Sequence, residues 1–180
     1  MLSKKIIVGV SSCLLGNNVR YDGGHRLDHC VRDRLGQFVE WLPVCPEVEA
    51  GLLTPREPMR LIDDGVSLRL VTMQTGVDQT VLLSRWSGNK LDQLERDEIC
   101  GFVFKARSPS CGVHDAEIVA SSGGLIRKGP GLFVAEVSKR FPSLPLEDEG
   151  RLQDPVIREN FIERILAYQR RRKLPAVKAD

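Results

Sequence analysis

The chain has 180 residues, a length that suits one domain and allows a sizeable core without disulfide or metal staples. Hydrophobic residues make up 42% and charged residues 28%, and the net charge of +2 gives no electrostatic case for binding nucleic acid or membranes. The apolar run at residues 6–10 is too short for a signal peptide or a membrane span, so we expect a cytoplasmic protein. Five scattered cysteines in a reducing compartment are expected to be core residues, metal ligands or nucleophiles.

Buried apolar runs alternate with amphipathic stretches along the chain. In the first half of the chain the patterns predict a strand over 6–10, a helix over 26–38, a strand over 38–44 and a hairpin that pairs 59–62 with 66–71. They then predict a helix over 77–94 with a possible break at 87–89, a strand over 99–104 and a mobile surface loop over 120–131. The last elements are a helix over 132–141, a short edge strand over 144–146 and a helix over about 154–173. This order predicts a single domain over 1–180 with a three-layer α/β/α fold, a mostly parallel central sheet and a small antiparallel hairpin.

Three cysteines, Cys13, Cys45 and Cys111, each follow a strand-like run and lie in a loop rich in Gly, Pro or Ser. In an open parallel sheet, ligands bind outside the carboxyl ends of the strands, so we expect the three thiols to meet at one point. Cys45 is followed by Pro46 and Glu47. Because proline restricts the residue before it to extended geometry, a rigid loop is expected to hold this thiol close to a carboxylate.

Several kinds of site are compatible with these thiols. A thiol phosphatase needs Cys-x5-Arg, but Arg20 falls one residue too late. Zinc usually requires closely spaced pairs such as Cys-x2-Cys, which are missing, although His25 or His114 can in principle complete a Cys₃His site. Three thiolates suit an iron–sulfur cluster with one iron that has no protein ligand and favours soft donors such as sulfur. Structural thiols are the plainest alternative, and Cys30 and Cys100 are predicted to be core residues.

Five motifs occur in order over about the first 145 residues. They are Ser12-Cys13-Leu14-Leu15-Gly16, Val19-Arg20-Tyr21-Asp22-Gly23, Pro43-Val44-Cys45-Pro46-Glu47, Gly51-Leu52 with Pro55-Arg56, and Ser108-Pro109-Ser110-Cys111-Gly112. With these motifs the chain resembles the thiouracil desulfurase family. The resemblance implies a small cytoplasmic enzyme that converts thiouracil to uracil and sulfide without net redox change.

The resemblance also implies the residues of the site. It places a [4Fe–4S] cluster with one open iron on three ligands, Cys13, Cys45 and Cys111. The family's catalytic carboxylate falls on Glu47 and its catalytic serine on Ser108. The expected partner is a small thiolated nucleobase; neither a membrane nor nucleic acid is expected as a partner, with thiolated transfer RNA left open.

Other interpretations of these residues stay open. Glu47 can instead form a structural ion pair with Arg20 or Arg56, and Ser108 can simply cap a turn. The alternative function is a non-catalytic iron–sulfur or zinc-binding module that senses sulfide or metal. Such a module needs the three cysteines but neither Glu47 nor Ser108, so the presence of both favours the enzyme.

Overall fold

The computed structural model describes residues 6–173. Its strands are β1 (Ile6–Ser11), β2 (Val39–Val44), β3 (Met59–Asp63), β4 (Leu68–Thr72), β5 (Phe102–Phe104), β6 (Ala116–Ala120), β7 (Leu125–Gly129) and β8 (Leu146–Asp148). Its α-helices are α1 (Pro46–Glu49), α2 (Thr80–Arg96), α3 (Leu132–Arg140) and α4 (Pro155–Lys173). Shorter helical turns are η1 (Ser12–Leu15), η2 (Cys30–Arg34), η3 (Leu35–Gln37) and η4 (Arg151–Gln153).

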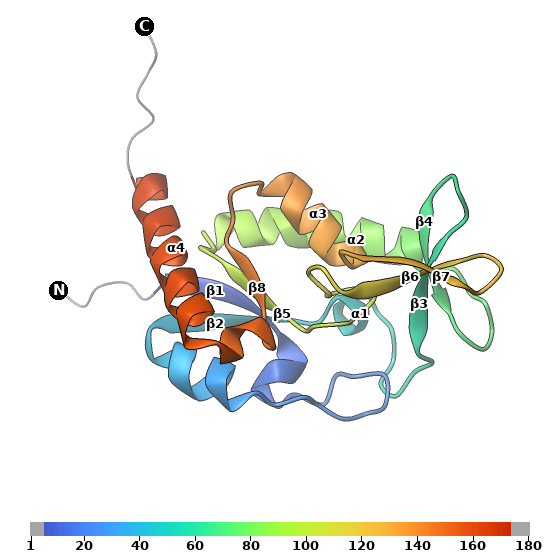
Figure 1. The fold of residues 1–180 in the computed structure, drawn as a ribbon, viewed down its shortest axis with the longest axis horizontal. Coiled ribbons are helices and arrows are strands. Elements are labelled where there is room, and N and C mark those ends of the chain that lie inside the picture. Colours follow the sequence, from blue (N-terminus) through green and yellow to red (C-terminus); the bar gives the residue numbers. More distant parts are fainter. Residues whose placement is uncertain (1–5, 174–180) are drawn as a thin grey trace, which may run out of the picture.

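The central sheet, sheet A, has the strand order β2-β1-β5-β8, and each neighbouring pair is parallel. Helices cover both of its faces, with α2 and α3 on one side and η2 with α4 on the other (Figure 1). The predicted three-layer α/β fold with a mostly parallel central sheet is therefore confirmed. The last strand, β8, lies at the sheet edge, where Pro145 before it accepts a hydrogen bond from Phe102 without having to donate one.

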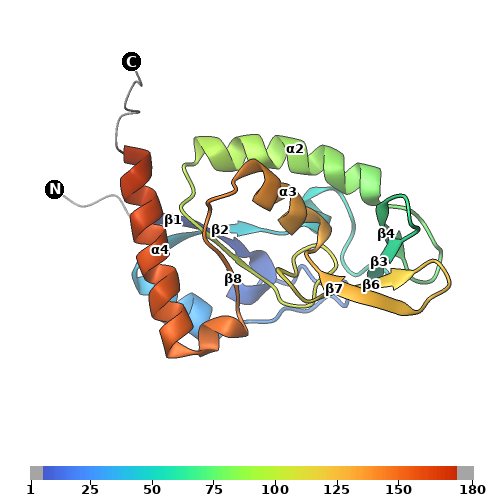
Figure 2. The ribbon, with the colours of Figure 1, turned by 45° about the horizontal axis from the view of Figure 1, so that its top comes forward.

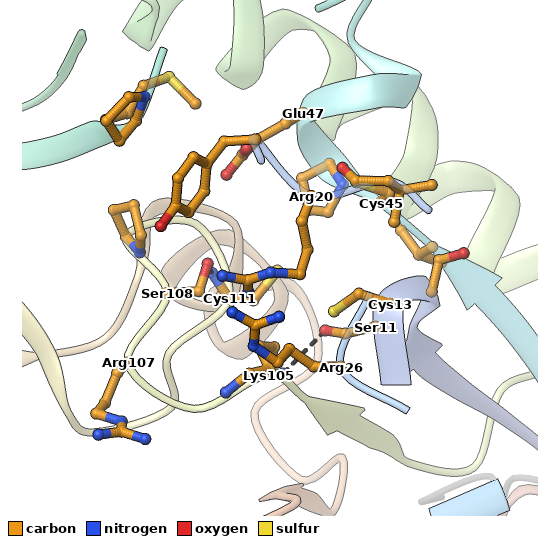
Figure 3. A pocket seen from close by; sticks show the side chains of 18 of the residues that line it. Ser11, Cys13, Arg20, Arg26, Cys45, Glu47, Lys105, Arg107, Ser108 and Cys111 are labelled. Atoms are coloured by element: carbon orange, nitrogen blue, oxygen red, sulfur yellow. Dashed lines mark hydrogen bonds between the residues drawn. The ribbon is translucent and has the colours of Figure 1, made fainter. Parts of the chain in front are cut away.

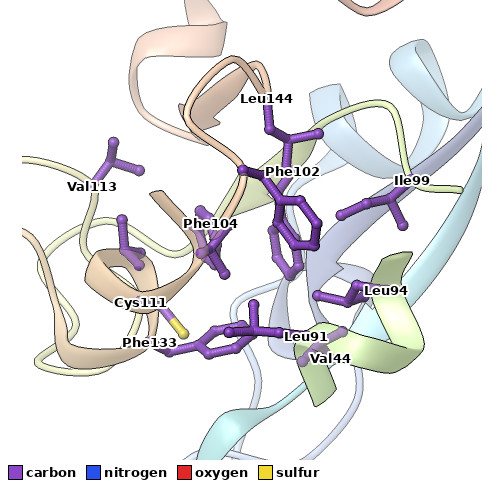
Figure 4. Packing of buried hydrophobic residues seen from close by; sticks show 13 residues of the cluster. Val44, Leu91, Leu94, Ile99, Phe102, Phe104, Cys111, Val113, Phe133 and Leu144 are labelled. Atoms are coloured by element: carbon purple, nitrogen blue, oxygen red, sulfur yellow. The ribbon is translucent and has the colours of Figure 1, made fainter. Parts of the chain in front are cut away.

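Alternating side chains on the strands of sheet A divide the core into two layers. On the side of α2 and α3, the rings of Phe102 and Phe104 stack with centroids 4.0 Å apart, and Phe133 of α3 meets both edge-on at 6.1 Å (Figure 4). On the other side, side chains such as Val8 of β1 pack with Phe161 of α4. Both faces of this sheet are thus buried, which explains the continuous apolar runs of its strands.

A second sheet, sheet B, has the strand order β4-β3-β6-β7 and lies at the end of the molecule away from α4 (Figures 1 and 2). Its β3–β4 pair is the predicted antiparallel hairpin, with Gly65 at φ +83° in the turn. The prediction of a mobile loop over 120–131 is wrong, because β6 and β7 form a second antiparallel hairpin there. The Gly/Ser run is only its turn, while Ala116 and Ile118 alternate into the core.

Some predicted boundaries also shift. The helix expected over 26–38 is replaced by the two short turns η2 and η3. It begins later than expected because Arg26 and Asp28 donate their N–H groups to the carbonyls of Cys13 and Leu14 instead. The strand expected over 99–104 is regular only in β5. Helix α2 runs unbroken through residues 87–89. Within residues 6–173, none of the helices has the length and apolar character needed to cross a membrane.

Candidate active site

Three cysteines from three different loops line one pocket of about 460 Å³ (Figure 3). Cys13 lies in η1 directly after β1, Cys45 is the residue that precedes α1 after β2, and Cys111 lies in the loop after β5. Because β2, β1 and β5 are parallel neighbours, their carboxyl ends open onto the same edge of sheet A. The fold therefore brings together thiols that are up to 98 positions apart in the sequence.

The loop that carries Cys111 is held in place by its neighbours. Ser11 at the end of β1 accepts a hydrogen bond from the N–H of Lys105 at 2.9 Å, which joins the first strand to the start of this loop. Gly131, just before α3, packs against the loop backbone so closely that a Cβ atom there would lie 2.5 Å from the carbonyl carbon of Ser110. The position of Cys111 is thus set by contacts from both sides of the loop.

Burial governs the state of the three thiols. Removal from water raises the pKa of Cys13 to about 11, with a smaller contribution from the nearby Cys45. Burial also raises the pKa of Cys45 and, most strongly, that of Cys111, with like-charge repulsion from Glu47 adding to both. Without a bound cation these thiols stay protonated at neutral pH, so metal binding must displace their protons.

Glu47 lines the same pocket and is fixed by two partners. Its Oε2 accepts from Nε of Arg56 at 2.8 Å and from Nη2 of the same guanidinium, and its Oε1 accepts from Oγ of Ser110 at 2.8 Å. Arg20 lies nearest to Asp22 instead, at 3.5 Å. The ion pair considered from the sequence is therefore present, with Arg56 as the partner, and it orients a carboxylate that still faces the pocket.

The hydroxyl of Ser108 accepts two hydrogen bonds from the backbone and keeps a hydrogen that it can donate. Its Oγ accepts the N–H groups of Ser110 at 3.3 Å and Cys111 at 3.1 Å, so it caps the turn that carries this cysteine. The same hydroxyl lines the pocket, where its hydrogen can still be donated. Ser110 was not singled out by the sequence as a functional residue; it belongs to the same motif, but no spacing rule predicts its contact with Glu47.

Most of the charged side chains in the pocket wall are cations. Besides Arg56 they are Arg20, Arg26, Lys105 and Arg107. Nε of Arg20 and Nη2 of Arg26 each lie 3.5 Å from a carboxylate oxygen of Asp22, and Lys105 is paired with Glu149. This positive lining favours negatively charged contents, such as a cluster held by thiolates.

The remaining zinc and cluster candidates lie elsewhere. Sγ of Cys30 contacts the carbonyl of Leu152 and Nη1 of Arg158, on the α4 side of sheet A, and Cys100 Sγ contacts the carbonyl of Glu98. Neither cysteine is among the residues that line the pocket, and the same holds for the exposed side chains of His25 and His114. The structure thus separates Cys30 and Cys100 from the three pocket thiols, as expected from the sequence.

Comparison with known proteins identifies the family. Residues 8–149 match the sequence model of the family described as 2-thiouracil desulfurase. The chain belongs to this family. The matched region holds all three pocket cysteines, Glu47 and Ser108, and ends before α4.

The chain is also similar to one curated protein and to one solved structure. The "Uncharacterized protein YbbK" of Bacillus subtilis (strain 168) is 33% identical over 109 residues, covering 57% of this chain and 71% of that protein. The solved structure of the [4Fe-4S]-dependent thiouracil desulfidase TudS is 31% identical and superposes with a TM-score of 0.69, covering 87% of this chain and 97% of that one. The family match and the likeness to TudS confirm the resemblance that the five motifs indicate.

Proposed function

We propose that this protein removes sulfur from a thiolated uracil, giving uracil and sulfide, with a [4Fe–4S] cluster held by Cys13, Cys45 and Cys111. The observation that carries the proposal is the shared pocket of three thiols and one carboxylate at the carboxyl edge of sheet A. Membership of the 2-thiouracil desulfurase family supports it, and so does the likeness to TudS, which is described as [4Fe-4S]-dependent.

The residues of the pocket fit such a cluster. Cys13, Cys45 and Cys111 line the pocket from the ends of three different strands. Three soft donors on separate walls are suited to a larger group that spans the space between them. The excess of cationic over acidic side chains in the lining suits the negative charge that thiolate-bound clusters carry. A cavity of this size is also typical of small-molecule sites.

The bound cluster would supply a Lewis-acidic iron that prefers sulfur donors and polarises the C–S bond. The rest of the chemistry is assigned to this chain's own residues. Glu47 takes a proton from a water molecule, whose oxygen adds to the carbon that bears sulfur. Ser108 donates a hydrogen bond to the substrate. Glu47 then gives its proton to the sulfur, and the C–S bond breaks as sulfur departs with the bonding electron pair as hydrosulfide. The added hydroxyl releases its remaining proton to Glu47 and becomes the carbonyl oxygen of uracil, so the reaction needs no oxidant or reductant.

Arg56 and Ser110 keep the base in position. They occupy Oε2 and one lone pair of Oε1, which leaves the second lone pair of Oε1 to accept a proton. The orientation is set before substrate arrives, a condition for efficient proton transfer. The ion pair of Glu47 with Arg56 therefore serves the catalytic role rather than competing with it.

The test is an anaerobic preparation in which iron and acid-labile sulfide are quantified before incubation with 2-thiouracil. We expect uracil and sulfide in equal amounts from cluster-loaded protein and none from metal-free protein. A matched Cys45→Ser preparation controls for free iron and sulfide in solution. Loaded protein that releases no uracil would contradict the proposal and favour a non-catalytic cluster-binding module.

A further inference from the structure

A buried lysine outside the pocket is connected to Cys45, one of the proposed cluster ligands. Lys90 lies in the middle of α2, and its side chain is only 8% exposed. A lysine is almost never buried unless its charge is paired. Its Nζ lies 2.9 Å from Oε2 of Glu49 and donates to Oε1 of Gln93 at 3.2 Å. The ammonium is therefore neutralised by a residue of α1, the short helix that follows Cys45.

The other oxygen of Glu49 reaches Cys45 itself. Oε1 of Glu49 accepts the backbone N–H of Cys45 at 3.0 Å, while the backbone N–H of Glu49 donates to the carbonyl of Cys45 at 2.9 Å. The arrangement resembles a capping box, in which a glutamate near the start of a helix satisfies the N–H of the residue that begins it. Both backbone polar groups of Cys45 are thus bound by one residue.

Helix α1 needs such an anchor. It has four residues, too few for a helix to be stable by itself, so contacts with other elements must set its direction. The ion pair links it to α2, which has 17 residues and packs in the core of sheet A. Since the backbone of Cys45 is held by Glu49, and Glu49 is held by Lys90, two side chains connect α2 to the backbone of Cys45.

We propose that Lys90 and Glu49 are positioning residues that fix Cys45 as a cluster ligand. The inference rests on the proposed function for the identity of the bound group, but the contacts it concerns are between residues of this chain and do not include that group. Partners that orient a metal ligand from behind commonly change metal affinity by about 10–100-fold when they are removed. Neither residue contacts the pocket, so neither is assigned a step in the reaction.

The test compares Lys90→Met with a matched control, Arg140→Met. Arg140, at the end of α3, pairs with Asp92 and Glu95 of α2, the helix that also carries Lys90. This pair lies on an exposed surface. In metal-free protein labelled with ¹⁵N-cysteine, each of the five cysteines gives one amide signal. We expect Lys90→Met to speed hydrogen exchange at the Cys45 amide by on the order of tenfold, with the Cys13 amide unchanged. Arg140→Met should leave both unchanged.

A second readout uses cluster-loaded protein. Iron release to a chelator should be about 10–100-fold faster in Lys90→Met than in the natural protein, and close to the natural rate in Lys90→Arg, which keeps the charge. The double variant Lys90→Met with Glu49→Gln leaves no buried charge unpaired and covers the case in which Lys90→Met does not fold. It should show the same faster release.

Two results would overturn the inference. One is an unchanged Cys45 amide in a folded Lys90→Met or double variant, and the other is an equal change at Cys45 in Arg140→Met, which would indicate a general loss of stability. If the natural protein binds no iron and sulfide at all, the proposed function fails. The exchange of the Cys45 amide still decides whether Lys90 and Glu49 position this residue.

Discussion

Arg56 donates to Oε2 of Glu47 from both Nε and Nη2, so one guanidinium holds one carboxylate oxygen with two hydrogen bonds. Its Nη2 also donates to the carbonyl of Val19 at 3.0 Å, in the loop that follows Cys13. With Ser110 on Oε1, the carboxylate joins the loops that follow all three strands of the pocket. Glu47 is therefore a structural junction as well as the proposed base, and its two roles can be separated by mutation.

Glu47→Gln keeps the size of the side chain and an oxygen that can accept from Arg56, but it removes the proton acceptor. We expect a loss of turnover of ~10²-fold or more with iron and sulfide content retained. The measurement is kcat for uracil release, normalised to iron per chain. Unchanged turnover in a fully loaded variant would remove Glu47 from the mechanism.

Ser108→Ala removes both the hydrogen that we assign to the substrate and the acceptor for the N–H groups of Ser110 and Cys111. Turnover should fall ~10-fold or more, and the loss of the cap should cost about 1 kcal/mol of stability. Ser108→Thr retains the hydroxyl and should keep most of both. Steady-state kinetics and urea unfolding of the same preparations check this prediction. Equal turnover and equal stability of Ser108→Ala and Ser108→Thr would contradict it.

Arg56→Met leaves Glu47 buried without its cation. The side chains of the pair are 10% and 14% exposed, so breaking the pair should destabilise the metal-free protein by about 3–5 kcal/mol. Arg140→Met breaks a more exposed pair, with 44% exposure for Arg140, and should cost about 0–1 kcal/mol. Urea-induced unfolding of both variants gives the comparison, and similar losses would show that the Arg56 pair is not a stabilising contact.

Replacing a pocket cysteine should abolish assembly of the cluster. In Cys13→Ser, Cys45→Ser and Cys111→Ser we expect iron and sulfide to fall to background after anaerobic reconstitution. The matched control is Cys100→Ala, which removes a buried thiol outside the pocket and should retain the full content. A variant at Cys100 that loses iron while remaining folded would refute the ligand assignment.

Gly131→Ala should disturb the site without touching a ligand. Its Cβ would lie 2.5 Å from the carbonyl carbon of Ser110 and 2.8 Å from the backbone nitrogen of Cys111, so the Cys111 loop would have to move. We expect reduced iron content and a loss of about 1–3 kcal/mol in stability. Gly88→Ala is the control, because a Cβ in that part of α2 meets nothing within 4 Å and alanine favours a helix.

Local sequence patterns were enough to predict the strands and loops that form the walls of the pocket. The apolar runs before Cys13 and Cys45 predict parallel strands, and the Gly, Pro and Ser residues around Cys111 predict a loop, because both patterns depend on neighbouring residues. The same reasoning missed the β6–β7 hairpin, since its turn has the composition of a loop and its outer strand is exposed from Leu125 to Lys128. An edge strand without a buried face leaves no apolar alternation to detect.

Side-chain contacts between separate elements could not be predicted from local patterns. Arg20 and Arg56 are equally plausible partners for Glu47 in the sequence, and only the path of the loops brings Arg56 to its Oε2. The tie between Lys90 and Cys45 spans 45 positions and passes through the side chain of Glu49. Such contacts follow from how α2 packs, which depends on the whole core and not on any one stretch.

The distribution of the pocket cysteines over β1, β2 and β5 has a consequence for how the protein is made. A nascent chain that has exposed Cys13 and Cys45 still lacks the third wall, which needs β5 and, behind the Cys111 loop, Gly131. The proposed cluster thus has no complete binding site until most of the chain has left the ribosome. Iron delivery is then expected to follow the synthesis of β5 and of the loop that carries Cys111.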